Sequence, residues 1–188
     1  MVEWSSLLIP IVVSAVLIFF ASSVIHMALK YHNADYRMLP NEDAVAAAIR
    51  QGGAAPGQYV IPHCKDHKQM NTPEMQRKFT DGPCGLLYLR PSHAIQMGPF
   101  LGRWIAYTLA VSAAVAYLAR AELHAGAPYL TVFRLVGTAA WFAYGWQGPA
   151  DSIWKGKPWI VTFKEMFDGL IYASLTAGTF AWLWPAAA

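Results

Sequence analysis

The chain has 188 residues, of which 56% are hydrophobic and only 13% are charged. Soluble domains usually carry about 25% charged residues, so this composition argues against an ordinary soluble domain and indicates a membrane protein. The net charge of +3 does not indicate a nucleic-acid partner, because basic residues that flank apolar spans face anionic lipid headgroups in any membrane protein. We therefore expect the lipid bilayer as a partner and no nucleic acid.

The first long apolar run covers residues 5–29, and no charged residue lies between Glu3 and Lys30. About 20 apolar residues are enough to cross the hydrocarbon core, so the run predicts a first transmembrane helix. A secretory signal peptide is the alternative. Its usual basic start is missing here, and the apolar run is longer than the usual stretch of about 7–15 residues. We therefore expect an uncleaved helix.

Residues 30–99 form a polar insertion, which we expect to be cytoplasmic. Nine of the 14 Lys and Arg residues lie between Lys30 and Arg103, and basic residues concentrate on the cytoplasmic side of membranes. Helix-start and helix-stop signals predict short helices at 42–51 and 73–79, and β-prone runs at 58–62 and 85–90 predict two strands. These elements predict a small mixed α/β subdomain whose core is marginal for independent folding.

Three further apolar stretches, at 100–120, 128–147 and 159–184, predict transmembrane helices two, three and four. The link at 147–158, which contains Trp154 and is flanked by Trp146 and Trp159, is read as a connection between spans. On this reading twelve Lys and Arg residues face inside, and Arg120 is outside. We therefore predict an all-α membrane protein of four spans in the cell (plasma or inner) membrane, with both termini outside.

Small residues recur at four-residue spacing on two of the predicted spans. Such stripes allow helix backbones to approach closely in a membrane. The pattern predicts either packing within this chain or docking of another subunit, and by itself it does not separate the two. The residues are Ala106, Ala110 and Ala114 in the second span and Gly169, Ala173 and Ala177 in the fourth.

Two ionisable residues, Arg134 and Asp168, lie inside predicted spans. A charge at the centre of the membrane costs about 2.5–3.5 kcal/mol on insertion scales, so such residues are candidates for function. Arg134 is close enough to a helix end for its side chain to reach the headgroups. Asp168 lies deeper, and we expect it to need a partner such as Arg134 or a Tyr or Ser hydroxyl.

Two other groups of side chains offer metal or cofactor ligands. His63, Cys64 and His67, with Cys84 downstream, have ligand types that suit zinc, although a second close ligand pair is missing. Solvated thiols or redox chemistry between Cys64 and Cys84 are the alternatives. His26, at the inner end of the first span, is consistent with a quinone or a partner's haem, or with plain headgroup contact.

No phosphate-binding, dinucleotide-binding or hydrolase motif is present in the sequence. We therefore predict a non-catalytic accessory, assembly or scaffold subunit of a membrane complex, which binds other membrane subunits or a second copy. The alternatives are a membrane enzyme or redox component that uses the Cys/His site, and a small transporter or channel. No cofactor is predicted, and zinc and quinone are the less favoured options.

Overall fold

The computed structural model describes residues 2–187 and is 67% helical, with one small two-stranded sheet. It divides into two compact units. The first unit comprises residues 1–35, 96–150 and 158–188, and the second comprises residues 36–95 and 151–157. Each unit is described separately below.

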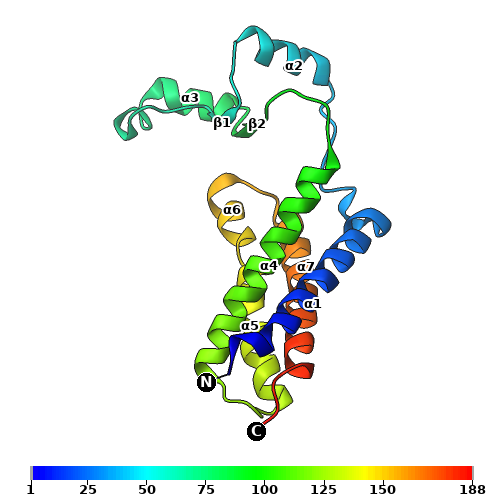
Figure 1. Ribbon diagram of the computed structural model, residues 1–188. Coiled ribbons are helices and arrows are strands. Elements are labelled where there is room, and N and C mark those ends of the chain that lie inside the picture. Colours follow the sequence, from blue (N-terminus) through cyan, green and yellow to red (C-terminus); the bar gives the residue numbers. More distant parts are fainter. Residues whose placement is uncertain (1, 188) are drawn as a thin grey trace. The chain divides into compact units, whose positions relative to one another are not determined.

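The first unit is a bundle of four helices, which Figure 1 shows running side by side. Contacts join α1 to α4, α4 to α5, α5 to α7 and α7 to α1, so the four helices form a closed ring. Both ends of the chain lie at the same end of the bundle, where the backbone N–H of Gly126 donates to Pro185 O at 2.7 Å. The helices are α1 (Trp4–Ser23), α4 (Met97–Glu122), α5 (Tyr129–Gly145) and α7 (Trp159–Trp182).

Small residues let α5 and α7 approach more closely than ordinary side chains would permit. A Cβ added to Gly169 would lie 2.6 Å from the Cα of Gly145, and a Cβ added to Gly137 would lie 3.2 Å from the Cβ of Ala177. Gly169, Ala173 and Ala177 are all buried. The stripe on the fourth predicted span is thus used for packing within the chain.

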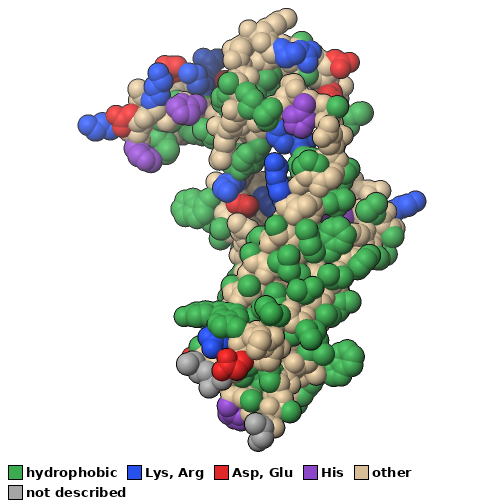
Figure 2. Space-filling model, viewed as in Figure 1, with side chains coloured by type: hydrophobic (Ala, Val, Ile, Leu, Met, Phe, Trp, Pro, Cys, Tyr) green, Lys and Arg blue, Asp and Glu red, His purple; other side chains and the backbone are tan. Residues whose placement is uncertain are grey.

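Two helices are long and apolar enough to cross a membrane. They are Trp4–Ala28, with a mean hydropathy of 2.6, and Met97–Glu122, with a mean hydropathy of 1.3. The other two bundle helices are less suited by length or composition, because α5 has only 17 residues and α7 carries Lys164, Glu165 and Asp168 in its first half. Large apolar side chains are exposed along the bundle, as Figure 2 shows for one face.

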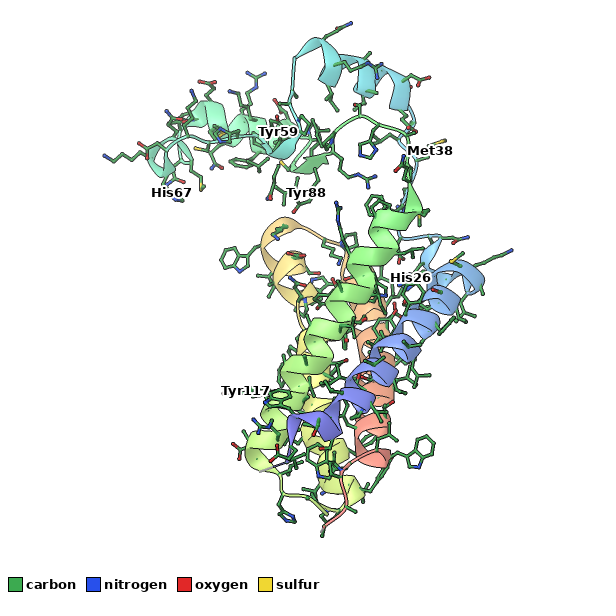
Figure 3. The ribbon with its side chains drawn as sticks, viewed as in Figure 1. His26, Met38, Tyr59, His67, Tyr88 and Tyr117 are labelled. Atoms are coloured by element: carbon green, nitrogen blue, oxygen red, sulfur yellow. The ribbon has the colours of Figure 1, made fainter. Side chains whose placement is uncertain are left out.

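The second unit is built around a two-stranded antiparallel sheet. Strands β1 (Gly57–Ile61) and β2 (Gly85–Leu89) pair with Gly57 opposite Leu89 and Ile61 opposite Gly85. The unit also holds α2 (Glu42–Gln51) and α3 (Pro73–Asp81). Figure 3 places Tyr59 and Tyr88 on the paired strands. The two β-prone runs and the two short helices are therefore present close to their predicted positions.

The connection between α5 and α7 was predicted from the sequence only as a link between two spans. It contains a further helix, α6 (Gly148–Lys155), in which Lys155 Nζ pairs with Asp151 Oδ1 at 2.6 Å. Proline in the first turn of a helix loses no internal hydrogen bond, so Pro149 is compatible with this helix start. Side chains at this four-residue spacing lie on the same face of a helix, so the ion pair supports the helix.

Candidate functional site

The end of α1 is irregular, and this irregularity builds the candidate site. The helix continues into a π-helical turn at Val24–Ala28, Leu29 is extended with φ −85° and ψ 119°, and a 3₁₀ turn follows at Lys30–His32. π-helical turns are rare and occur frequently at functional sites. This path places the rings of His26 and His32 with their centroids 4.7 Å apart.

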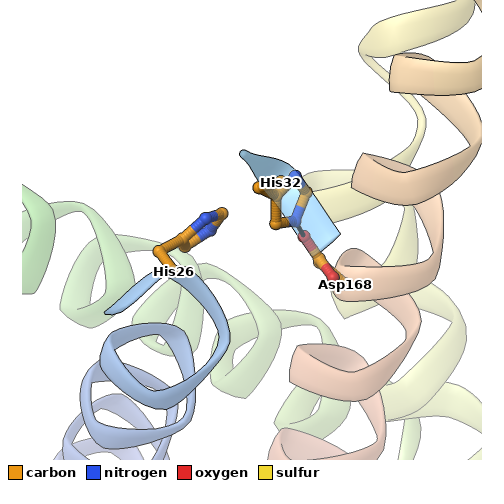
Figure 4. A group of neighbouring side chains, drawn as sticks. All are labelled: His26, His32 and Asp168. Carbon is orange, nitrogen blue, oxygen red and sulfur yellow. Dashed lines mark hydrogen bonds and ion pairs between the residues drawn. The ribbon is translucent and has the colours of Figure 1, made fainter. Parts of the chain in front are cut away.

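His32 lies between two carboxylates. Its Nδ1 is 2.6 Å from Oδ2 of Asp35, and its Nε2 is 2.7 Å from Oδ2 of Asp168 on α7. The His32 side chain is 13% exposed, and both carboxylate side chains are 4% exposed. Figure 4 shows the Asp168 carboxylate directed toward the His32 ring, with His26 on the other side. The imidazole therefore holds the segment after α1 against α7.

Asp168 has a second partner in the same segment. The Tyr31 hydroxyl donates a hydrogen bond to Oδ1 of Asp168, while His32 contacts Oδ2. Both carboxylate oxygens are thus engaged. A buried carboxylate is costly unless it is paired and hydrogen-bonded, and this carboxylate meets both conditions.

Lys164 completes the cluster from one helical turn away on α7. Its Nζ donates to Oδ1 of Asp35 at 2.5 Å and to the backbone carbonyl of Tyr31 at 2.6 Å. The Lys164 side chain is 22% exposed, so the ion pair with Asp35 is largely shielded from water. We refer to Tyr31, His32, Asp35, Lys164 and Asp168 as the polar cluster.

Two members of the polar cluster have shifted pKa values. Burial raises the pKa of the Asp35 carboxyl, but hydrogen bonds from Lys164 and His32 outweigh burial, and the pKa is lowered overall. For Tyr31, burial and then the hydrogen bond to Asp168 both act in the same direction and raise the pKa of the hydroxyl. Tyr31 is therefore a neutral hydrogen-bond donor at physiological pH, and Asp35 is an anion.

An apolar layer supports the polar cluster from within the bundle. Ile18, Ile25 and Tyr172 are buried together, and Tyr31 and Trp104 pack against them. The indole N–H of Trp104 donates to Ser22 Oγ at 2.8 Å, which fixes α4 to the end of α1. This packing orients the π-helical turn that carries His26.

Asp168, predicted to need a partner, is buried and has two. The partners are Tyr31 and His32, and not Arg134, which is exposed on α5 beside a cavity of about 250 Å³. A tyrosine hydroxyl was among the partners expected from the sequence. The role of His32 was not predicted, because nothing in the sequence indicates that residues 136 positions apart meet.

The Cys/His motif lies in the second unit. Cys64 Sγ donates to the backbone carbonyl of Asp66 at 2.9 Å, and Cys84 Sγ donates to that of Phe79 at 3.4 Å. Within residues 2–187, the cluster of three or more ligand side chains close enough to share an ion is His26, His32 and Asp168. Zinc binding by His63, Cys64, His67 and Cys84 stays a prediction.

The small residues on α4 have a different environment from those on α7. Ala106, Ala110 and Ala114 are exposed, and a Cβ added to Gly102 would meet no atom within 4 Å. Among residues 2–187, therefore, no helix packs on the outward face of α4.

Comparison of the chain with protein-family models, with curated proteins and with solved structures found no match.

Proposed function

We propose that this protein is an accessory or assembly subunit of a membrane complex, which crosses the membrane four times and binds another subunit through α4. The observation that carries the proposal is the outward face of α4, where Ala106, Ala110 and Ala114 are exposed between larger neighbours such as Tyr107 and Tyr117.

The contact between α5 and α7 supports this use of the α4 face. Where small residues face each other within the chain, as at Gly145 and Gly169, the helices pack backbone to backbone. In lipid, the hydrophobic effect does not favour the association of one helix with another, so helices associate through such close packing. The occupant that fits the α4 face is a transmembrane helix of another subunit with small residues of its own.

Crosslinking tests this proposal. In a background with Cys64→Ser and Cys84→Ser, we expect Ala110→Cys to form a specific crosslink to another membrane protein in native membranes. Val12→Cys on α1 is the control, because Val12 is 51% exposed on a face without small-residue spacing. An equal crosslinking yield from both positions would contradict the proposal. An adduct of twice the chain mass would show that the partner at this face is a second copy of this chain and not another subunit.

A bulky substitution gives an independent measurement. Ala110→Phe should release the protein from its complex, so that it migrates as a smaller species on a native gel in mild detergent. Val12→Phe should leave the complex intact. If Ala110→Phe also leaves the size of the complex unchanged, the α4 face is covered by lipid alone.

The proposed orientation places residues 30–99 in the cytoplasm and both termini outside. It is supported by the twelve Lys and Arg residues on the inner side, against Arg120 on the outer side. We expect Cys64 and Cys84 to react with a membrane-impermeant thiol reagent only after cells are permeabilised. Labelling of both cysteines in intact cells would reverse the orientation.

A further inference from the structure

We propose that His26, His32 and Asp168 bind a divalent transition-metal ion. Their ligand atoms, one from each side chain, all lie within 4.8 Å of one another. The residues come from the π-helical turn, the 3₁₀ turn and α7, so the fold brings together groups that are far apart in the sequence (Figure 4). This site does not depend on the α4 face and adds an activity beyond the proposed membrane subunit.

The chemistry of the three ligands selects the class of ion. Two imidazoles and one carboxylate suit Zn²⁺ and Fe²⁺, whereas Mg²⁺ and Ca²⁺ prefer oxygen ligands alone. Three protein ligands leave at least one coordination position open for water or another ligand. Sites of this kind bind exchangeable ligands, while structural zinc sites usually have four protein ligands.

A second set of contacts orients the ligands as metal sites require. Nδ1 of His32 lies 2.6 Å from the carboxylate of Asp35, which also forms an ion pair with Lys164. Nε2 of His32 is therefore the ring atom that can bind the ion. A carboxylate behind a histidine ligand fixes the ring and makes it a better donor, and such partners accompany nearly all histidine ligands. Tyr31 similarly engages Oδ1 of Asp168 and leaves Oδ2 directed at the site.

The adjustment needed to admit the ion is small. Nε2 of His32 and Oδ2 of Asp168 are 2.7 Å apart and hydrogen-bonded to each other. Ligands bound at about 2.0–2.2 Å around one tetrahedral ion lie about 3.3–3.5 Å apart, so the ion replaces this hydrogen bond when the two atoms separate by less than about 1 Å.

His26 provides access to the site. Its side chain is exposed, and it lines a cavity of about 270 Å³ together with Met27, Met97 and Trp104. Its ligand atom lies within 4.8 Å of those of His32 and Asp168, so His26 completes the set of three ligands.

The test is a titration of the purified full-length protein with Zn²⁺ and, separately, with Co²⁺, whose visible absorption reports its ligands. We expect about one ion per chain, a spectrum typical of nitrogen and oxygen ligands, and an affinity weakened by about tenfold or more in His26→Ala. His124→Ala is the control, because His124 is an exposed histidine whose backbone carbonyl accepts a hydrogen bond from Trp184 Nε1.

Further variants separate this site from the Cys/His motif. Asp168→Asn should weaken binding as His26→Ala does, and thermal unfolding shows whether each variant is folded. If His26→Ala does not fold, the Co²⁺ spectrum of the unaltered protein decides, because thiolate ligands give intense charge-transfer bands that this site lacks. Absence of ion binding, binding equal in His26→Ala and the unaltered protein, or binding lost only in Cys64→Ser would each overturn the proposal.

Discussion

Substitution of Gly169 by alanine should weaken the bundle at the contact between α5 and α7. The added Cβ would lie 2.6 Å from Gly145 Cα and 2.7 Å from Gly145 N. Carbon atoms in ordinary contact are about 3.5–4.0 Å apart, so the two helices must separate by about 1 Å. Because both close atoms belong to the backbone, no rotation of a side chain relieves the overlap. Overpacking of this kind costs about 1–3 kcal/mol.

A matched glycine isolates the steric cost. Alanine is more favourable than glycine in a helix by about 0.8–1.0 kcal/mol, and this gain applies equally to Gly169→Ala and Gly102→Ala. A Cβ at Gly102 meets nothing within 4 Å, so Gly102→Ala should be as stable as the unaltered protein or more stable. The difference between the two variants, about 1–3 kcal/mol, then measures the overlap alone.

The assay is unfolding by SDS titrated into protein in a mild detergent, followed by circular dichroism. Gly137→Ala should fall between the other two variants, because its Cβ would be 3.2 Å from a side-chain atom, Ala177 Cβ, and not from backbone. Equal stability of Gly169→Ala and Gly102→Ala, or a larger loss in Gly137→Ala, would refute the reasoning from close backbone contact.

Two further predictions concern polar contacts inside the bundle. Ser14 on α1 and Ser112 on α4 are hydrogen-bonded through Oγ atoms 3.0 Å apart. A double-mutant cycle of Ser14→Ala and Ser112→Ala should give a coupling free energy of about 0.6–1.7 kcal/mol. Strictly additive losses of stability would argue against this hydrogen bond. Lys164→Met leaves the Asp35 carboxylate without its ammonium partner but with its contact to His32, and should cost about 1–3 kcal/mol. Adding Asp35→Asn should recover part of that loss in the same unfolding assay, and a further loss would contradict the pairing.

The sequence predicted the elements of the fold well where each rests on local chemistry. The apolar run at 5–29 corresponds to α1 and its π-helical turn, and the two β-prone runs pair as β1 and β2. Helix α6 was not predicted, because it is only eight residues long and begins at a Gly-Pro pair that resembles a turn. In an apolar protein, a short helix differs little in composition from the connection around it.

The candidate site could be predicted only in part. Depth along the fourth apolar stretch indicated that Asp168 needs a partner, and the structure supplies one in Tyr31. Nothing in the sequence indicated that Lys164, near the start of the fourth predicted span, forms an ion pair with Asp35, 129 residues away in the chain. Periodicity reports which residues share one helix face. It carries no information on which segments meet, so the polar cluster required the tertiary structure.

The irregular end of α1 explains why the two histidines meet at all. In a continuous α-helix, residues 26 and 32 would be separated by about 9 Å along the axis and by about 240° around it, so their rings would point in different directions. The π-helical turn and the extended Leu29 change this path and bring the ring centroids to 4.7 Å. A regular helix would give up fewer backbone hydrogen bonds, yet it would carry His32 away from Asp168. The local departure from helical geometry is therefore the feature on which both the closure of the polar cluster and the proposed metal site depend.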